Sequence, residues 1–380
     1  MRRPLVILVL LVLIACSVIW YANVTGQPAA LAKFGQPQTA VSSPTSAPAP
    51  TPVVVFQRPE LETGVAFPQY GSNAYGSTDP YWSTGIGEID HQTGARWVEI
   101  IINFDQAYYN SSTISIGSST PSLRSLRQGI QLAHKLGMKV FMAPFISLEH
   151  NSPENEKWSG DISCDTLATC STWFTNYFQV YQPFLRVAEQ TGVEQVAIGT
   201  ELQTLEILHE HYWDDFINNV TSVYKGHLTY DTNFSSILAH LNVPPTWFSN
   251  ARLYALGVSA YFSLVDTPTS VPTSQIPALW AQHVQAPLDA LSSATGKPII
   301  LSELGYRNDA DALYEPYVTT AFGAPDPTLQ AAAFDAAMQN IVEDHSITGV
   351  FVWAWSMPVY EPNNLPAAQA LHTWYTSPKA

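Results

Sequence analysis

The chain has 380 residues, of which 46 % are hydrophobic and 12 % aromatic, and it carries a formal net charge of −15. The length suffices for one large domain or two of ordinary size. Nucleic-acid binding requires a basic face that contacts phosphates, so the acidic balance argues against a nucleic-acid partner. The 11 Trp and 18 Tyr residues are many for this length, and they fit either core packing or stacking against the apolar faces of sugar rings.

Residues 1–22 have the pattern of a membrane-targeting segment. Arg2 and Arg3 precede an apolar run from Leu5 to Ala22, which is typical of a signal sequence or a signal anchor. At about 1.5 Å per residue the run is just long enough to span a bilayer. The tetrapeptide Leu-Ile-Ala-Cys also resembles a bacterial lipobox, which would make Cys16 a lipidated N-terminus after cleavage. We expect the rest of the chain outside the cytoplasm, tethered to the membrane through its N-terminus only, or secreted.

Residues 23–58 form the next segment. From Gln27 to about Arg58 the chain is rich in Pro, Ala, Ser, Thr and Gln and almost uncharged. Such a composition cannot bury a core, and its prolines keep it extended. We therefore predict a linker that leads to one folded domain over residues 59–380.

From Leu61 onward, short apolar runs alternate with segments of helical periodicity. The predicted strands are Thr63–Phe67, Arg96–Phe104, Lys139–Phe145, Gln195–Glu201, His227–Phe234, Leu253–Phe262, Pro298–Ser302 and Gly349–Trp355. The predicted helices between and after them are Pro121–Gly137, Thr172–Gln190, Leu202–Lys225, Pro277–Ser293, Thr328–Asp344 and Leu365–Tyr375. This alternation indicates a (β/α)8 TIM barrel. A doubly wound open sheet is less favoured, because no glycine-rich phosphate turn follows the first strand.

Two glutamates stand where two of these strands end. Glu201 closes the fourth strand, and Glu303 follows the seventh directly. In such a barrel the active site lies at the C-terminal ends of the strands. Two carboxyl groups about 5–5.5 Å apart serve a retaining glycosidase as acid/base and nucleophile, provided that their surroundings keep one protonated and the other ionised. Few Lys or Arg residues lie nearby in sequence as salt-bridge partners, so we favour catalysis over a structural role.

Other polar and aromatic side chains near strand ends are candidates for substrate contact. Trp353 and Trp355 alternate onto one face of the last strand. The remaining candidates from strand ends are Asn103, Tyr230, Asn233 and Tyr261.

Five short motifs carry a family resemblance. They are Gly199-Thr-Glu-Leu202, Leu228-Thr-Tyr230, Ser259-Ala-Tyr-Phe262, Ser302-Glu-Leu-Gly-Tyr-Arg307 and Gly349-Val-Phe-Val-Trp353. In order and strand placement they resemble glycoside hydrolase family 113, which includes β-mannanases and belongs to a clan of retaining (β/α)8 glycosidases. The resemblance covers about Gly64 to Trp355.

The resemblance implies that Glu201 is the acid/base and Glu303 the nucleophile. It also implies that Tyr261 orients the nucleophile and that a Trp of the last strand forms the floor of the sugar site. Trp158, in a Trp-x-Gly loop, and Tyr306, just after Glu303, are further expected substrate contacts.

Neither a cofactor nor a metal is expected. Cys164 and Cys170 are close in sequence, so a small loop disulfide is plausible in an oxidising compartment, whereas no Cys or His partners stand at zinc-like spacing. A group of polar residues after the fourth strand is interpreted as a solvated helix face rather than a set of metal ligands. Its members are Glu206, His209, Glu210 and His211.

The sequence thus predicts an exported, membrane-tethered, monomeric retaining glycoside hydrolase that cleaves β-linked polysaccharide or oligosaccharide, with mannan-type substrates favoured. A β-glucanase or a transglycosylase on the same fold is the first alternative. The second is a non-catalytic surface carbohydrate-binding protein. The presence of both Glu201 and Glu303 argues against this second alternative.

Overall fold

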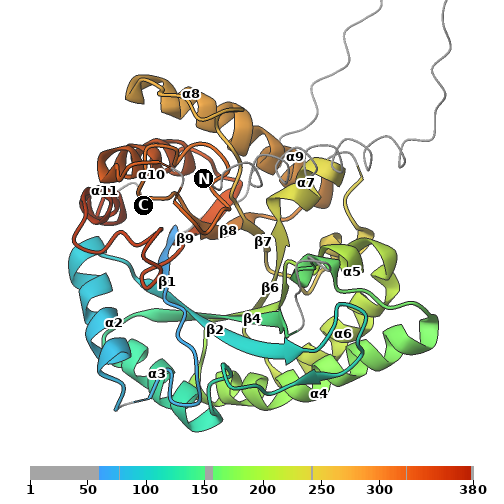
Figure 1. The fold of residues 1–380 in the computed structure, drawn as a ribbon. Helices are drawn as coiled ribbons and strands as arrows, with labels where there is room; N and C mark the ends of the chain where they lie inside the picture. The colour runs from blue at the N-terminus through green and yellow to red at the C-terminus, as the bar shows by residue number, and fades with distance from the viewer. Residues whose placement is uncertain (1–59, 77, 150–156, 241–242, 322, 378–380) are drawn as a thin grey trace, which may run out of the picture. The chain divides into compact units, whose positions relative to one another are not determined.

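The computed structural model describes residues 60–76, 78–149, 157–240, 243–321 and 323–377. Within them, eight parallel strands form a closed barrel, because each strand pairs with the next and β9 returns to β1, which also pairs with β2 (Figure 1). The barrel strands are β1 (Glu62–Ala66), β2 (Trp97–Gln106), β4 (Lys139–Leu148), β5 (Gln195–Thr200), β6 (His227–Asn233), β7 (Leu256–Ser259), β8 (Ile299–Leu304) and β9 (Ile347–Val352). The short β3 (Ile114–Ser115) pairs antiparallel with the end of β2. The predicted (β/α)8 barrel is confirmed.

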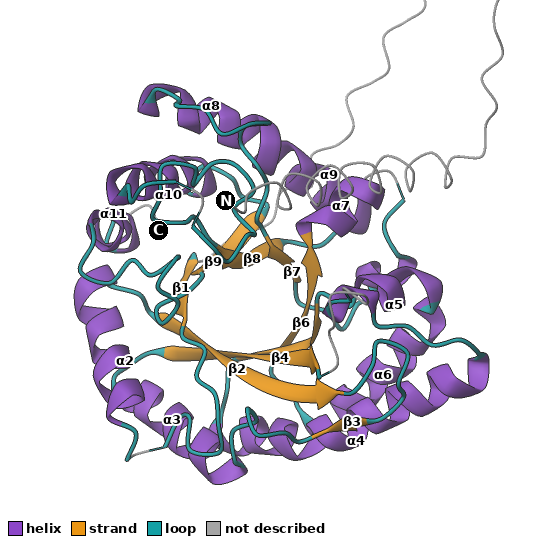
Figure 2. Cartoon of the chain, in the orientation of Figure 1, coloured by secondary structure: helices purple, strands orange, loops and turns teal. Residues whose placement is uncertain are grey.

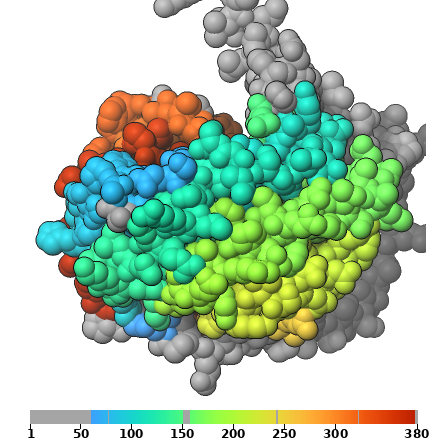
Figure 3. Space-filling model, turned by 90° about the horizontal axis from the view of Figure 1, so that it is seen from below, coloured from blue at the N-terminus to red at the C-terminus, as the bar shows by residue number. Residues whose placement is uncertain are grey.

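Helices surround the barrel on its outer side (Figure 2). The longer ones are α2 (Pro80–Thr93), α3 (Leu123–Lys135), α4 (Leu167–Thr191), α6 (Glu210–Val223), α9 (Ala286–Thr295), α10 (Pro327–Ile341) and α11 (Pro366–Tyr375). The shorter ones are α5 (Gln203–Leu208), α7 (Phe234–His240) and α8 (Ile276–Trp280), with the turns η1 (Ser159–Asp161), η2 (Thr246–Ser249), η3 (Thr273–Gln275) and η4 (Ala281–Gln285). Figure 3 shows one side of this layer, where successive segments from cyan to yellow-green lie side by side in chain order.

The core has two parts, as the alternation of strand side chains requires. A large cluster fills the space between strands and helices, and residues such as Ile100 and Ile102 contribute to it from β2. A smaller cluster inside the barrel takes the alternate residues of the same strand, Trp97 and Ile101. Because the barrel interior is filled by side chains, a ligand can reach it only from an end of the barrel.

The helices differ from the prediction between the first two strands and after the fourth strand, among other places. Helix α2 was not predicted between the first two strands; Asp79 caps it by accepting hydrogen bonds from the N–H groups of Tyr81 and Trp82. The single helix predicted over Leu202–Lys225 is instead α5 and α6, which are separated at His209, where the backbone leaves the helical conformation at φ −137° and ψ 41°.

The targeting segment with Cys16 and the whole linker lie outside the described residues, so the predictions for them remain predictions. Among the helices that the structure describes, none is both long enough and apolar enough to cross a bilayer.

Candidate active site

A cleft of about 860 Å³ opens where the barrel strands end, a size typical of ligand sites. Glu201, Asn233, Tyr261, Glu303 and Trp353 all line it. A smaller recess of about 310 Å³ adjoins it and shares Phe145, Trp158 and Glu201 with it. The two predicted carboxyl groups therefore face one cleft.

Glu201 follows the last residue of β5 in an unusual backbone conformation. Its φ is 56°, in the left-handed region that residues other than glycine rarely occupy. Its N–H donates to the carbonyl of Asp231 at 2.7 Å, and its Oε1 accepts from Asn233 Nδ2 at 2.7 Å. Part of the side chain remains open to the cleft, yet burial of the carboxyl raises its pKa, while the Asn233 hydrogen bond opposes this rise.

Glu303 is carried by strand β8 itself and is only 6 % exposed. Its Oε2 accepts a hydrogen bond of 2.6 Å from the Tyr261 hydroxyl. Burial raises the pKa of Glu303 well above its usual range, and the nearby Glu201 charge raises it further, whereas the Tyr261 hydrogen bond lowers it. Like charges disfavour double ionisation, so ionisation of one carboxyl favours the neutral form of its neighbour.

Aromatic rings give the cleft its apolar surface. Phe145 and Trp353 stack at a centroid distance of 5.7 Å and an interplanar angle of 11°. On another wall, Phe234 and Tyr317 stack at 5.6 Å and 25°. Tyr317 is 44 % exposed and Trp158 is 39 % exposed. Partly exposed aromatic rings in a cleft are suited to stacking on the apolar faces of sugars.

The comparisons with known proteins bear on what such a site does. The family model for glycoside hydrolase family 113 matches residues 80–375. The chain belongs to glycoside hydrolase family 113. It is therefore a glycoside hydrolase. No protein matches in the comparison with curated proteins.

Solved structures show the same fold. A β-1,4-mannanase of family 113 is 20 % identical with a TM-score of 0.70, and the match covers 84 % of this chain and 99 % of that one. A β-mannanase of family 113 from Alicyclobacillus acidocaldarius is 21 % identical with a TM-score of 0.70, covering 83 % and 97 %. A β-D-glucuronidase from Dictyoglomus thermophilum is 14 % identical with a TM-score of 0.56, covering 87 % and 53 %.

The loop that carries Trp158 is fixed from two sides in this glycoside hydrolase. Thr204 Oγ1 donates to the carbonyl of Gly160 at 2.8 Å. Gly160 lies under the Trp158 indole, because a Cβ at position 160 would come within 2.2 Å of that ring. Cys164 and Cys170 are joined by a disulfide, which links this loop to the first turn of α4.

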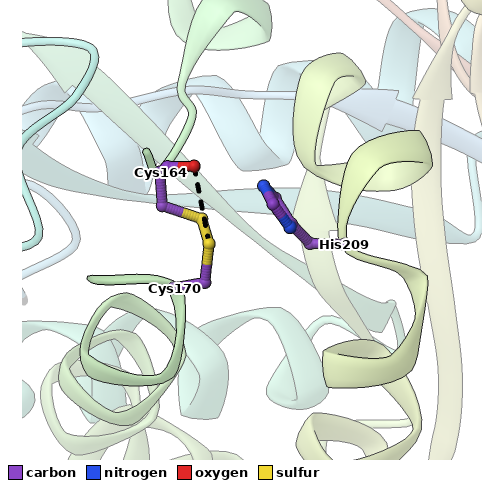
Figure 4. A group of neighbouring side chains, drawn as sticks. All are labelled: Cys164, Cys170 and His209. Carbon is purple, nitrogen blue, oxygen red and sulfur yellow. Dashed lines mark hydrogen bonds between the residues drawn. A yellow bond between two sulfur atoms is a disulfide. The ribbon is translucent and has the colours of Figure 1, made fainter. Parts of the chain in front are cut away.

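His209 lies beside that disulfide, with its ring directed toward it (Figure 4). The ligand atoms of the two cysteines and His209 all lie within 4.8 Å of one another. The two sulfur atoms are bonded to each other, however, so neither is a thiolate that could bind a metal. Burial lowers the pKa of His209, which favours its neutral form.

Tyr230 and Asn103 do not line the cleft, contrary to the sequence prediction. Tyr230 points to the outer side of β6 because strand residues alternate, so it faces away from Asp231 and Asn233. Asn103 is on the inner side of β2, but its amide donates to Asp105 Oδ1 at 3.2 Å and accepts from Ser147 at 2.7 Å.

Trp355 and Tyr306 also do not line it. The prediction for Trp355 assumed that the last strand continues to that residue, but β9 ends at Val352, so the alternation with Trp353 no longer holds. Tyr306 lies beyond the end of β8, is 1 % exposed, and packs its ring edge-on against Phe334 of α10.

The position of Glu206 contradicts the prediction of a solvated helix face after the fourth strand. Its side chain is completely buried and accepts hydrogen bonds from Tyr230, Thr232 and Ser236. Burial raises the pKa of Glu206 to about 7, and the three hydroxyl donors oppose that rise. The apolar spacing of the segment does not reveal that this helix is short and enclosed.

Two further acidic residues lie inside the barrel, below the cleft. Burial raises the pKa of Glu99 well above its usual range, and the charges of Glu303 and Asp231 raise it further. Burial likewise raises the pKa of Asp231. Neither Glu99 Oε2 nor Asp231 Oδ2 has a hydrogen-bond partner among the described residues. Burial and neighbouring negative charges therefore favour the neutral forms of these two carboxyls.

Several cleft residues were not predicted from the sequence. Phe145 follows Pro144 at the end of a predicted strand, and that position was the only signal for it. Phe234 had an equivalent signal as the last residue of the predicted strand His227–Phe234. Glu315 and Tyr317 lie in a loop whose conformation depends on Arg307, which donates to the carbonyls of Asp311, Tyr314 and Glu315. No sequence pattern indicates that loop.

Proposed function

We propose that this glycoside hydrolase is a retaining β-mannanase, with Glu201 as acid/base and Glu303 as nucleophile. The observation that carries the proposal is the pair of carboxyls at the ends of β5 and β8, which face one cleft and in which the Glu201 charge raises the pKa of Glu303. Such a pair holds one proton and one negative charge, which are what double displacement consumes in its first step.

In the first step, Glu303 attacks the anomeric carbon while Glu201 gives its proton to the leaving oxygen. The Tyr261 hydroxyl donates to Glu303 Oε2 and so favours its ionised form. Asn233 donates to Glu201 Oε1, which leaves Oε2 of the neutral acid free to carry the proton. The glycosidic bond breaks, and a covalent bond from Glu303 to the sugar replaces it.

In the second step, Glu201 is ionised and takes a proton from water. That water attacks the anomeric carbon from the side that the leaving group vacated. Glu303 departs as a carboxylate, and Glu201 regains its proton. Two inversions at one carbon give net retention of configuration.

The mannan preference has weaker support than the reaction type. It comes from the structural neighbours, which are β-mannanases of the same family. An aromatic cleft without Lys or Arg among its described lining residues suits a neutral polysaccharide. We further propose that the enzyme acts outside the cytoplasm as a monomer and is held at the membrane by residues 1–22.

The test is hydrolysis by the full-length protein of a panel of mannan, glucomannan, mixed-linkage β-glucan, cellulose and xylan. We expect reducing ends from mannan first, with the β-anomer of the product appearing before mutarotation in proton NMR spectra. Glu303→Ala serves as the inactive control. Preference for β-glucan would replace the mannan assignment, transfer to added sugar would indicate a transglycosylase, and an initial α-anomer would overturn retention.

A further inference from the structure

A second buried carboxylate lies directly behind Glu201, on the outer side of the barrel. Glu206 of α5 accepts from Tyr230 at 2.8 Å on Oε1, and from Thr232 at 3.1 Å and Ser236 at 2.6 Å on Oε2. Its side chain is 0 % exposed. Three hydroxyl donors and no cation satisfy this group, so it is built into the structure as an acceptor that orders hydroxyl groups.

One of those hydroxyls connects Glu206 to the backbone beside Glu201. The Tyr230 oxygen accepts from the N–H of Leu202 at 3.0 Å while its own hydrogen goes to Glu206. The Leu202 N–H donates to the Tyr230 hydroxyl, which in turn donates to Glu206 Oε1, so the three groups form a continuous hydrogen-bond chain that ends on the carboxylate acceptor. Because each hydrogen bond polarises the next, the carboxylate strengthens the bond that holds Leu202.

The Tyr230 ring is held in place by its neighbours. Trp213 of α6 and Trp247 of η2 stack on each other at 4.6 Å, and both meet the Tyr230 ring nearly edge-on. On the strand side, a Cβ at Gly199 would come within 3.0 Å of the ring. The absence of a side chain at position 199 thus lets Tyr230 approach β5 closely enough to reach Leu202.

Glu201, which lies between the end of β5 and Leu202, is the residue whose backbone conformation needs support. Glu201 has φ 56°, a conformation that costs free energy and persists only where surrounding contacts hold it. On one side its N–H donates to the Asp231 carbonyl, and on the other the peptide of Leu202 is held by Tyr230. We propose that Glu206, acting through Tyr230, is a positioning residue that fixes the turn and aims the Glu201 carboxyl at the leaving oxygen.

This inference rests on the proposed acid/base role of Glu201, and it predicts a defect confined to proton donation. An activated leaving group departs with little protonation, whereas a poor one requires the acid. The test compares kcat/KM for dinitrophenyl and unsubstituted phenyl β-glycosides of mannose or a short manno-oligosaccharide. This parameter reports only steps through the first irreversible one, so slow deglycosylation does not obscure it.

In Tyr230→Phe we expect kcat/KM for the phenyl glycoside to fall about tenfold to a hundredfold, because Leu202 N–H and Glu206 Oε1 lose their shared partner. The value for the dinitrophenyl glycoside should stay within about threefold of wild type. Glu206→Gln keeps an acceptor for Tyr230 but not the charge, so it should show the same selectivity to a smaller degree.

Two matched variants control for general destabilisation. Thr232→Val removes one donor to Glu206 and leaves the Tyr230 link intact. Glu210→Gln alters a neighbouring half-buried carboxylate that accepts hydrogen bonds from Thr246. Both should keep the wild-type ratio of the two kcat/KM values. Melting temperatures show whether each variant is folded, and if Tyr230→Phe is not, the isosteric Glu206→Gln decides alone.

The outcomes separate this inference from the proposed function. A leaving-group-dependent loss in Glu201→Ala together with a wild-type ratio in Tyr230→Phe and Glu206→Gln would overturn the positioning role only. Equal losses on both substrates in those two variants would show a merely structural role. If Glu201→Ala shows no dependence on the leaving group, the acid role fails and the inference fails with it.

Discussion

The ends of β5 and β8 place the same kind of side chain in one cleft by different means. Strand β8 continues through Glu303 to Leu304, so the extended backbone of the strand carries that carboxyl, although the pairing register with β7 and β9 shifts there. Strand β5 ends at Thr200, and Glu201 stands in a left-handed turn outside it. Strand β8 and the Tyr261 hydroxyl position Glu303. Glu201 depends instead on hydrogen bonds with β6 and on the buried network around Glu206.

The hydrogen-bond donors to the two carboxyls also differ. A phenolic hydroxyl donates to Glu303, and an amide donates to Glu201. A carboxyl that must stay ionised benefits from a rigid mount and a strong donor. A carboxyl that must give up and recover a proton has to point accurately at two different oxygens in turn. The proposed nucleophile and the proposed acid/base therefore differ in their supports as much as in their position.

The largest expected effect comes from removing the nucleophile. Glu303→Ala should lower kcat by about 10⁴- to 10⁶-fold, because no covalent intermediate can form. Added azide should occupy the vacated side and give a glycosyl azide of inverted configuration, which NMR would identify. An azide product of retained configuration would mean that the roles of the two strand ends have been exchanged.

Glu201→Ala should have a smaller effect, about 10²- to 10⁴-fold on polysaccharide. With an activated aryl glycoside, cleavage needs little acid, so the covalent intermediate should accumulate and be visible by mass spectrometry of the intact protein. Azide needs no base, and here it should restore turnover and give the retained glycosyl azide. Wild-type turnover of polysaccharide by this variant would refute the acid/base role proposed for Glu201.

The parts of this site that depend on regular strands could be predicted from the sequence. An apolar run followed by Glu locates Glu201 and Glu303, and the alternation of strands and helices gives the barrel. The same reasoning cannot assign faces beyond a strand's end. Trp355 was grouped with Trp353 by alternation, but β9 ends at Val352.

The parts that depend on long-range contacts could not be predicted. Glu206 is a titratable residue on a helix whose sequence does not signal its burial, and only the fold brings Tyr230, Thr232 and Ser236 to it. Tyr317 reaches the cleft through a loop arranged by a buried Arg307. Such residues are set by contacts between distant segments, which spacing in the sequence does not encode.

Loss of the hydrogen-bond donors to the two glutamates, Tyr261 and Asn233, should have intermediate and separable effects on the pH profile of kcat/KM. The Tyr261 hydrogen bond lowers the pKa of Glu303, so Tyr261→Phe raises that pKa. Because the nucleophile must be ionised, the acid limb should move to higher pH, with about a tenfold loss of activity at the optimum.

Asn233→Ala should act on the opposite limb. Asn233 lowers the pKa of Glu201, so its loss raises that pKa, keeps the acid protonated to higher pH, and should move the basic limb upward. The two limbs of the pH profile report the coupled pair rather than one residue each. The pH profiles of the two variants are therefore compared with each other on the same substrate. Movement of the acid limb in Asn233→Ala, with none in Tyr261→Phe, would reverse the assignment of the two strand ends.

The smallest expected effect concerns Trp158, which belongs to the Glu201 side of the cleft. It borders the main cleft and also the smaller recess that contains Glu201 but not Glu303. If Glu201 is the acid, the leaving part of a polysaccharide lies on this side. Loss of one stacking ring costs about 0.5–1.5 kcal/mol, so Trp158→Ala should raise KM for polysaccharide about two- to tenfold at nearly constant kcat. An aryl glycoside has no sugar there, so its KM should stay unchanged.

Gly160→Ala should have a similar effect on the KM for polysaccharide, because the added methyl would displace the Trp158 ring. Tyr81→Ala, at an exposed tyrosine away from the cleft, is the control. Equal changes in KM for both substrates would place Trp158 on the other side of the scissile bond.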